Sequence, residues 1–161
     1  MFRLIDSPLG PLRLQVSPRG LSRVEFTAAS ILQKEMGGVE EGDVGKRSAD
    51  VLDTAQAQLT EYFAGRRRSF ELPLDPPTTT EFRAAVHAQL AEIGYGETVT
   101  YRDVAKLLGR PGATRAVGSA CGANPLLIVR PCHRVLRSDG GLGGYAGGLE
   151  AKRFLLTLEE N

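Results

Sequence analysis

The sequence has few of the residues that build disulfide frameworks or metal sites, and it has no long apolar segment. Its only cysteines are Cys121 and Cys132, which cannot form the disulfide framework of a small secreted domain. Its only histidines are His87 and His133, so we expect no separate four-ligand Cys/His zinc site and no metal. No apolar run approaches the ~20 residues needed to span a bilayer, and the N-terminus lacks the layout of a signal peptide. These absences favour a reducing cytoplasm, where a thiol stays available for reaction.

Length and charge suggest a small globular protein with one basic region. A chain of 161 residues suits one compact domain or two small lobes, and 42% hydrophobic with 24% charged residues is ordinary for a globular protein. The net charge of +1 hides an asymmetry, because residues 81–161 carry ten basic and eight acidic residues whereas 1–80 carry ten and eleven. Residues 104–138 contain no acidic residue and six basic ones: Lys106, Arg110, Arg115, Arg130, Arg134 and Arg137. Such a region predicts a positive surface suited to a polyanion.

The first half has the pattern of a small antiparallel sheet with one helix. Short apolar or alternating runs separated by Pro/Gly turns predict strands at 2–6, 12–16 and 21–26. We expect a variable loop over 27–48, an amphipathic helix over 49–64 that ends at Gly65, and a further strand at 70–72. No catalytic pattern is visible here, so lobe 1–72 is interpreted as a scaffold. The proline-rich stretch 73–80 is the predicted connector to a second lobe, 81–161.

The second half predicts helices that include a helix-turn-helix, so the expected fold class is α+β. A helix over 81–93 can be capped by Thr79 or Thr80, and His87 on it is expected at the surface or the edge of the core. Thr100 and Asp103 have the spacing of a capping box, residues 109–112 make a turn, and 113–122 make a second helix. The inward faces of the two helices are expected to hold Val104, Leu107 and Leu108, and Ala116, Val117 and Ala120.

The second helix of this pair is poor in side chains that read bases. It offers Ala113, Thr114, Gly118 and Ser119, with Arg115 as its only long side chain. Base-reading helices usually carry several long polar residues. This helix therefore predicts close approach to a nucleic acid with little reading of sequence.

A thiol, an imidazole and two guanidinium groups are adjacent in the segment 128–135, which reads Ile-Val-Arg-Pro-Cys-His-Arg-Val. Positive charge and a proton acceptor favour the thiolate form of a cysteine, whose ordinary pKa is about 8.5. His133 could accept the proton of Cys132, while Arg130 and Arg134 could supply the field. Because free cysteines are often buried and inert, this pair alone does not decide the function. Cys121, on the second helix, is interpreted as a packing residue rather than a second acceptor.

The wider context of the cysteine resembles a known signature. Pro131-Cys132-His133-Arg134-Val135 is preceded by Asn124-Pro125 and followed by Gly143-Gly144-Tyr145 and Gly147-Gly148-Leu149. This arrangement resembles the active site of the O6-alkylguanine-DNA alkyltransferases, or methylated-DNA–protein-cysteine methyltransferases, and the resemblance is strongest from about residue 80 to residue 159. It implies a repair protein that flips O6-alkylguanine out of duplex DNA and transfers the alkyl group irreversibly to its own cysteine, once and without a cofactor.

The resemblance also implies roles for catalytic residues. Cys132 would accept the alkyl group, His133 would take its proton through a water, and Glu159 would orient and charge-stabilise His133. Tyr101 would donate to the departing guanine. Asn124 would be the hinge between the helix-turn-helix and the cysteine segment.

Further implied roles concern DNA and the flipped base. Arg115 would fill the space that the flipped nucleotide leaves in the stack. The residues implied at the DNA surface are Ala113, Thr114, Arg115, Ser119 and Arg134, and those around the base are Val135, by its carbonyl, with Tyr145 and Ala146. A larger or polar side chain often occupies the position of Ala146 in the family, so the preferred alkyl size stays open.

Three other functions compete with this interpretation. A non-catalytic damage sensor would lack the acceptor cysteine, which is present here. A helix-turn-helix regulator would need more base-reading side chains on its second helix. A cysteine hydrolase would need Cys132 and His133, which are adjacent in the chain, to form a direct nucleophile–base pair, and this is geometrically awkward. The expected partner is double-stranded DNA carrying O6-alkylguanine, with O4-alkylthymine and cooperative binding left open, and no membrane. We expect a monomer in a prokaryotic cytoplasm, associated with the nucleoid.

Overall fold

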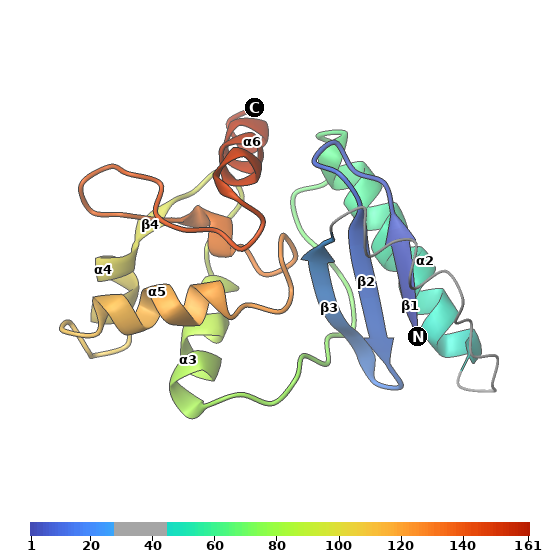
Figure 1. The fold of residues 1–161 in the computed structure, drawn as a ribbon, viewed down its shortest axis with the longest axis horizontal. Coiled ribbons are helices and arrows are strands. Elements are labelled where there is room, and N and C mark those ends of the chain that lie inside the picture. Colours follow the sequence, from blue (N-terminus) through green and yellow to red (C-terminus); the bar gives the residue numbers. More distant parts are fainter. Residues whose placement is uncertain (28–44) are drawn as a thin grey trace. The chain divides into compact units, whose positions relative to one another are not determined.

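A computed structural model describes residues 1–27 and 45–161, so most of the predicted loop 27–48 lies outside the described residues (Figure 1). The chain divides into two compact units, Met1–Pro77 and Thr78–Asn161, and the division falls within the predicted connector 73–80. Among the described helices, none is both long and apolar enough to cross a membrane.

The first unit is a three-stranded antiparallel sheet with one helix packed against it. The strands β1 (Phe2–Ile5), β2 (Leu12–Ser17) and β3 (Gly20–Phe26) lie in sequence order, as predicted. Alternation along β2 buries Leu12, Leu14 and Val16, and these residues form a core with one face of α2 (Gly45–Phe63). The α+β class and the three predicted strands at 2–6, 12–16 and 21–26 are thereby confirmed.

Two predictions for the first unit are wrong. The helix α2 begins at Gly45, inside the predicted loop 27–48. No strand forms at 70–72; instead Leu21 donates to the Pro73 carbonyl and accepts from the Asp75 amide, both at 2.8 Å. The connector therefore extends the sheet edge because the free edge of β3 offers it hydrogen-bonding groups.

The second unit is mostly helical. Its elements are α3 (Glu81–Leu90), β4 (Val99–Thr100), α4 (Tyr101–Leu107), α5 (Thr114–Gly122), the 3-10 turn η1 (Cys132–Arg134), β5 (Val135–Leu136) and α6 (Leu149–Glu159). Thr80 caps α3 by accepting from the Arg83 amide at 3.2 Å. The predicted capping box is confirmed, since the Asp103 amide donates to Thr100 Oγ1 at 3.0 Å and the Thr100 amide donates to Asp103 Oδ2 at 2.9 Å. The turn after α4 brings α5 against α4 and α3 (Figure 1).

The helical faces of this pair differ in part from the predicted ones. In α4 the buried residues are Val104 and Ala105, while Leu107 is 63% exposed. In α5 they are Val117, Ala120 and Cys121, and Ala116 is exposed. In both helices the buried face is rotated relative to the predicted one. A short helix can bury alanine or cysteine as readily as a larger apolar residue, so the positions of the larger residues did not identify the buried face.

Two long-range contacts organise the second unit around its cysteine. His87 is buried, contrary to expectation, and its Nε2 lies 2.7 Å from the Ala120 carbonyl, which ties α3 to α5. The strands β4 and β5 pair in parallel, with Val99 opposite Val135. Since Tyr101 directly follows β4 and Cys132 shortly precedes β5, this pairing holds α4 and η1 side by side.

Candidate active site

Cys132 lies at the start of the 3-10 turn η1 and is 4% exposed. The loop before it contains Ile128 with φ of 71°, which is the only left-handed non-glycine residue among those described. A branched side chain is strained in this region of backbone conformation. The side chain of Asn124 braces the loop, because its Nδ2 donates to the Arg130 carbonyl at 2.8 Å and its Oδ1 accepts from the Leu126 amide at 3.0 Å.

His133 and Arg134 converge on one buried carboxylate. His133 Nε2 lies 2.9 Å from Glu159 Oε1, and both residues are nearly inaccessible. Arg134 donates to Glu159 through Nε at 2.9 Å and Nη2 at 2.7 Å, and through Nη1 to the Ile93 carbonyl at 2.6 Å. The prediction that Glu159 orients His133 thus has the required geometry. The prediction that Arg134 contacts DNA does not, because its guanidinium is buried and committed to Glu159 and Ile93.

Glu159 determines which nitrogen of His133 can act as a base. Burial opposes ionisation of Glu159, but hydrogen bonds from His133 and Arg134 outweigh it and lower the pKa of the carboxyl to about 2. An ionised carboxylate only accepts, so Nε2 of His133 carries a proton. Burial also lowers the pKa of His133, so the imidazole is neutral at pH 7 and Nδ1 has a free lone pair. Nδ1 is buried and has no hydrogen-bond partner among the described residues.

The charges around Cys132 differ from those expected. Burial raises the pKa of the Cys132 thiol. A hydrogen bond with the Asn124 side chain and the positive charges of Lys152 and Arg130 act in the other direction and lower this pKa, but burial has the larger effect. Lys152 therefore takes the place that we expected Arg134 to fill. The sequence analysis missed Lys152, although its spacing gives a signal. Lys152 and Glu159 lie on the same face of α6 as the apolar Leu155, so two charged residues occupy the face of the helix that is expected to be buried.

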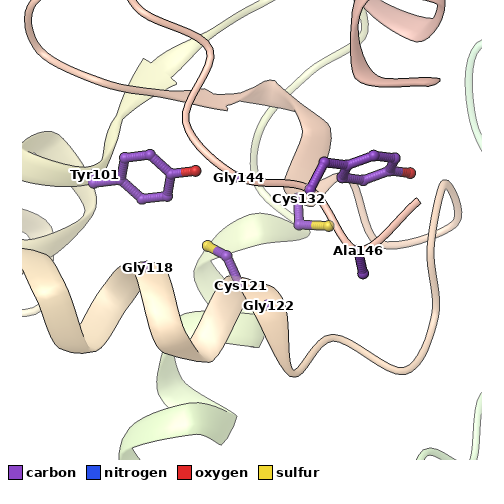
Figure 2. A pocket seen from close by; sticks show the side chains of 8 residues that line it. Tyr101, Gly118, Cys121, Gly122, Cys132, Gly144 and Ala146 are labelled. Carbon is purple, nitrogen blue, oxygen red and sulfur yellow. The ribbon is translucent and has the colours of Figure 1, made fainter. Parts of the chain in front are cut away.

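A pocket of about 410 Å³ opens beside the cysteine (Figure 2). Its lining comes from α4, α5, η1 and the glycine-rich segment, and consists of Tyr101, Gly118, Cys121, Gly122, Cys132, Gly144, Tyr145 and Ala146. Both cysteine side chains project into the space between Tyr101 and Ala146 (Figure 2). The volume lies within the range of small-molecule sites, and the glycines leave backbone walls that a flat base can approach closely.

Cys121 is a pocket residue that sequence reasoning assigned only to packing. It is 6% exposed and lines the same pocket as Cys132. Burial and the neighbouring Cys132 raise the pKa of the Cys121 thiol to about 12. A thiol with such a pKa is a poor nucleophile at neutral pH.

The remaining predicted residues divide between pocket, surface and interior. Arg115 and Ser119 are exposed on α5, while Ala113 and Thr114 at its start are half-buried. Tyr145 and Ala146 line the pocket, and the Tyr145 ring meets His133 edge-on with ring centres 6.4 Å apart. Val135 is fully buried outside the pocket lining, and its carbonyl accepts from Lys152 Nζ at 2.7 Å rather than facing the pocket freely.

Comparisons with known proteins agree with this geometry. Residues 1–76 match the ribonuclease-like domain of 6-O-methylguanine DNA methyltransferase, and residues 81–161 match the DNA-binding domain of the same family. A methylated-DNA–protein-cysteine methyltransferase of Methanosarcina barkeri is 42% identical over 160 residues, covering 99% of this chain and 97% of that protein.

Solved structures give the same relationship. The O6-methylguanine methyltransferase of Mycobacterium tuberculosis is 38% identical and superposes with a TM-score of 0.81, covering 99% of this chain and 92% of that one. The structure of the Mycobacterium tuberculosis OGT in complex with DNA superposes with a TM-score of 0.83 at the same identity and coverage. With both domain models matched and relatives of this identity along nearly the whole chain, this protein belongs to the 6-O-methylguanine-DNA methyltransferase family.

Proposed function

We propose that this protein is a single-use DNA repair enzyme, a methylated-DNA–protein-cysteine S-methyltransferase that moves the alkyl group of O6-alkylguanine onto its own Cys132. The observation that carries this function is the placement of Cys132 in the wall of a pocket of about 410 Å³, directly before a buried His133–Glu159 pair. A nucleophile, a base and a group that orients the base are the parts that cysteine chemistry requires.

The proton of the thiol leaves for His133. Because Nε2 is bonded to Glu159, Nδ1 is the accepting atom, and a water carries the proton from Sγ to it. Glu159 stabilises the imidazolium that results. Adjacent residues cannot readily form a direct nucleophile–base pair, and the relay removes that difficulty.

Transfer is a displacement at the alkyl carbon. A bond forms between Sγ of Cys132 and this carbon as the bond between the carbon and O6 breaks, and the electron pair passes into the guanine ring. Tyr101, at the opposite side of the pocket, donates to the ring as this charge develops. The product on the protein is a thioether, which neither His133 nor water hydrolyses, so each chain acts once and needs no cofactor.

The surface of α5 brings DNA to the pocket. A base inside a duplex is out of reach of a side chain, so the damaged nucleotide must be extruded, which costs a few kcal/mol. Arg115, exposed on α5, fills the place of the flipped base in the stack. The small side chains of Ala113, Thr114 and Ser119 let the helix approach the DNA backbone. Repair then proceeds at any sequence, and the protein acts as a monomer.

Labelled substrate tests the proposal. Duplex DNA with a radiolabelled methyl group on O6 of one guanine should label the peptide that contains Cys132 and saturate near one label per chain. Cys132→Ala should bind this DNA without taking label. Cys121→Ala is the matched control, which removes the other pocket thiol and should leave the stoichiometry unchanged.

Other outcomes identify the competing functions. Turnover beyond one equivalent would point to a hydrolase, and binding of the damaged duplex without transfer to a damage sensor. Label on Cys121 in the wild-type protein would move the acceptor role to α5.

The cellular setting follows from the substrate. The relatives named above come from an archaeon and a bacterium. We place the protein in a prokaryotic cytoplasm in association with chromosomal DNA, since its thiol must stay reduced and its substrate is the genome. Ala146 contributes only a small side chain to the pocket lining, and the same transfer assay with larger O6-alkyl groups will define the size limit.

A further inference from the structure

Lys152 is a buried cation beneath the proposed active site. It lies on α6 with no exposed surface, and its Nζ is surrounded by oxygen atoms from three other segments. It donates to the Val135 carbonyl at 2.7 Å, to the Gly144 carbonyl at 3.2 Å, to the Leu142 carbonyl, and to Tyr101 Oη at 3.4 Å. A buried lysine is rare unless it is paired, and no carboxylate pairs with Lys152 in the described part of the chain.

The hydrogen bond to Tyr101 has only one possible direction. The ammonium group of Lys152 has three N–H donors and no acceptor, so one N–H is shared among the four surrounding oxygen atoms, and Tyr101 Oη can only accept in its 3.4 Å contact. The single O–H of the phenol is then directed elsewhere. Since Tyr101 lines the pocket and its hydroxyl points toward the Gly144 side of that space, the O–H remains available to a bound base (Figure 2).

A second contact holds the same ring. Gly143 adopts φ of +72°, and a Cβ on it would lie 2.6 Å from Tyr101 Oη and 2.7 Å from Cε2. The backbone of the glycine-rich segment therefore abuts the phenol, and Lys152 binds the carbonyls on both sides of Gly143, those of Leu142 and Gly144. Lys152 thus fixes both the hydroxyl and the segment that limits its movement.

We propose that Lys152 is a positioning residue for alkyl transfer, which keeps the Tyr101 phenol turned as a hydrogen donor toward the departing guanine. This inference rests on the proposed function. As the bond between O6 and the alkyl carbon breaks, the electron pair enters the guanine ring and the Tyr101 O–H donates to a ring nitrogen. If the proton moves fully, Lys152 returns one to the tyrosinate through the same contact and is left as a neutral amine.

The protonation tendencies of the pair agree with this direction. Burial lowers the pKa of Lys152, although the nearby Cys132 and Cys121 oppose this shift. Burial, with Cys121 and Cys132, raises the pKa of Tyr101 to about 12. A proton therefore passes readily from Lys152 to a tyrosinate, and not from the phenol to the amine.

A double-mutant cycle separates this role from mere support of the fold. Lys152→Met removes the donor while keeping an unbranched side chain, and we expect the single-turnover rate at saturating DNA to fall on the order of 10–100-fold. Tyr101→Phe should lose a similar factor. In the Tyr101→Phe background, Lys152→Met should remove less than about threefold more, because its effect passes through the hydroxyl. Lys46→Met, the same change at an exposed lysine of α2, is the matched control and should transfer at the wild-type rate.

DNA affinity gives a readout that a positioning role leaves unchanged. In a Cys132→Ala background, Lys152→Met should alter the Kd for the O6-methylguanine duplex by less than about twofold. The inference would be overturned if the rate loss of the double mutant equalled the product of the losses of the two single mutants. It would also be overturned if Lys152→Met transferred at the same rate as Lys46→Met. A rate loss that is matched by the loss in DNA affinity would overturn it as well.

A second pair of variants applies if Lys152→Met does not fold. Lys152→Arg has donors only and preserves the direction of the bond, whereas Lys152→Gln offers an acceptor to which the phenol can turn. The rate should be higher for Lys152→Arg than for Lys152→Gln, and the reverse order would refute the inference. Wild-type protein is run beside every variant: failure of the wild type to take up one label would refute the proposed function itself, whereas normal labelling with unaffected Lys152 variants would refute only the role of Lys152.

Discussion

The Glu159 carboxylate accepts a hydrogen bond of 2.9 Å from Nε2 of His133, although the two residues lie in the last helix and in the turn that carries the nucleophile. The same carboxylate binds Arg134 through two nitrogens. One acidic residue therefore sets the tautomer of the base and neutralises a buried guanidinium. This double role means that changes at Glu159 alter stability and chemistry together.

Glu159→Gln should destabilise the protein by roughly 3–5 kcal/mol near pH 7, because it leaves Arg134 buried without its counter-charge. Urea unfolding measures this loss. The pKa of Glu159 is lowered from 4.5 to about 2 in the folded protein, so its contribution is present above pH 4.5 and is lost as the pH falls toward 2. The difference between wild type and variant should therefore shrink across that window. Glu160→Gln, at the exposed neighbour, is the control, and a constant difference at all pH values would refute the assignment.

The rate of alkyl transfer should rise with pH above neutrality. Burial raises the pKa of the Cys132 thiol, so the thiolate that attacks carbon is the minor form at pH 7 and becomes more abundant as the pH increases. Burial lowers the pKa of His133 from 6.5, so any loss of rate from protonation of this base should occur only below pH 6.5. Single-turnover rates with a free-base substrate between about pH 5 and 9 will test both limbs. A flat profile above pH 6.5 would indicate that the thiolate is already formed.

Gly143→Ala should impair transfer through Tyr101. The added Cβ would lie 2.6 Å from Tyr101 Oη, so either the ring or the glycine-rich segment must shift, and we expect a loss of about tenfold or more in rate. Gly140→Ala is a matched control in the same segment, because Gly140 also has a positive φ, of +87°, but its Cβ would have nothing within 4 Å. Equal losses for the two variants would attribute the effect to backbone strain rather than to Tyr101.

Arg115→Ala should separate repair of duplex DNA from the chemistry of transfer. Without the side chain that fills the stack, extrusion of the base becomes less favourable, and repair of duplex substrate should fall about tenfold. Transfer from a free O6-alkylguanine base should stay within about twofold of wild type, since no extrusion is required. Arg153→Ala, at an exposed arginine of α6, controls for the loss of one positive charge. Equal losses on both substrates would exclude the role of Arg115 in flipping.

Local signals in the sequence were sufficient to predict most of the helices and strands and to identify Cys132 as the candidate nucleophile. Turn residues delimited the three strands, and the spacing of Thr100 and Asp103 identified the capping box before α4. Both features depend on residues close together in the chain, and so does the resemblance carried by residues 131–135 with their flanks. Interactions of short range can be inferred from order alone.

The surroundings of the nucleophile were decided by the tertiary structure. Because Arg134 is close to Cys132 in the sequence, we expected its charge to act on the thiol or to contact DNA. In the folded protein Glu159 lies beside Arg134, and the guanidinium of Arg134 is buried against that carboxylate. Lys152, twenty residues beyond Cys132 in sequence, instead provides charge beside the thiol and contacts Tyr101. The sequence by itself thus determined which residues can react and which segments become helices and strands. Only the packing of α4, η1 and α6 decided which charges are buried together, because burial and pairing depend on distances that no local pattern encodes.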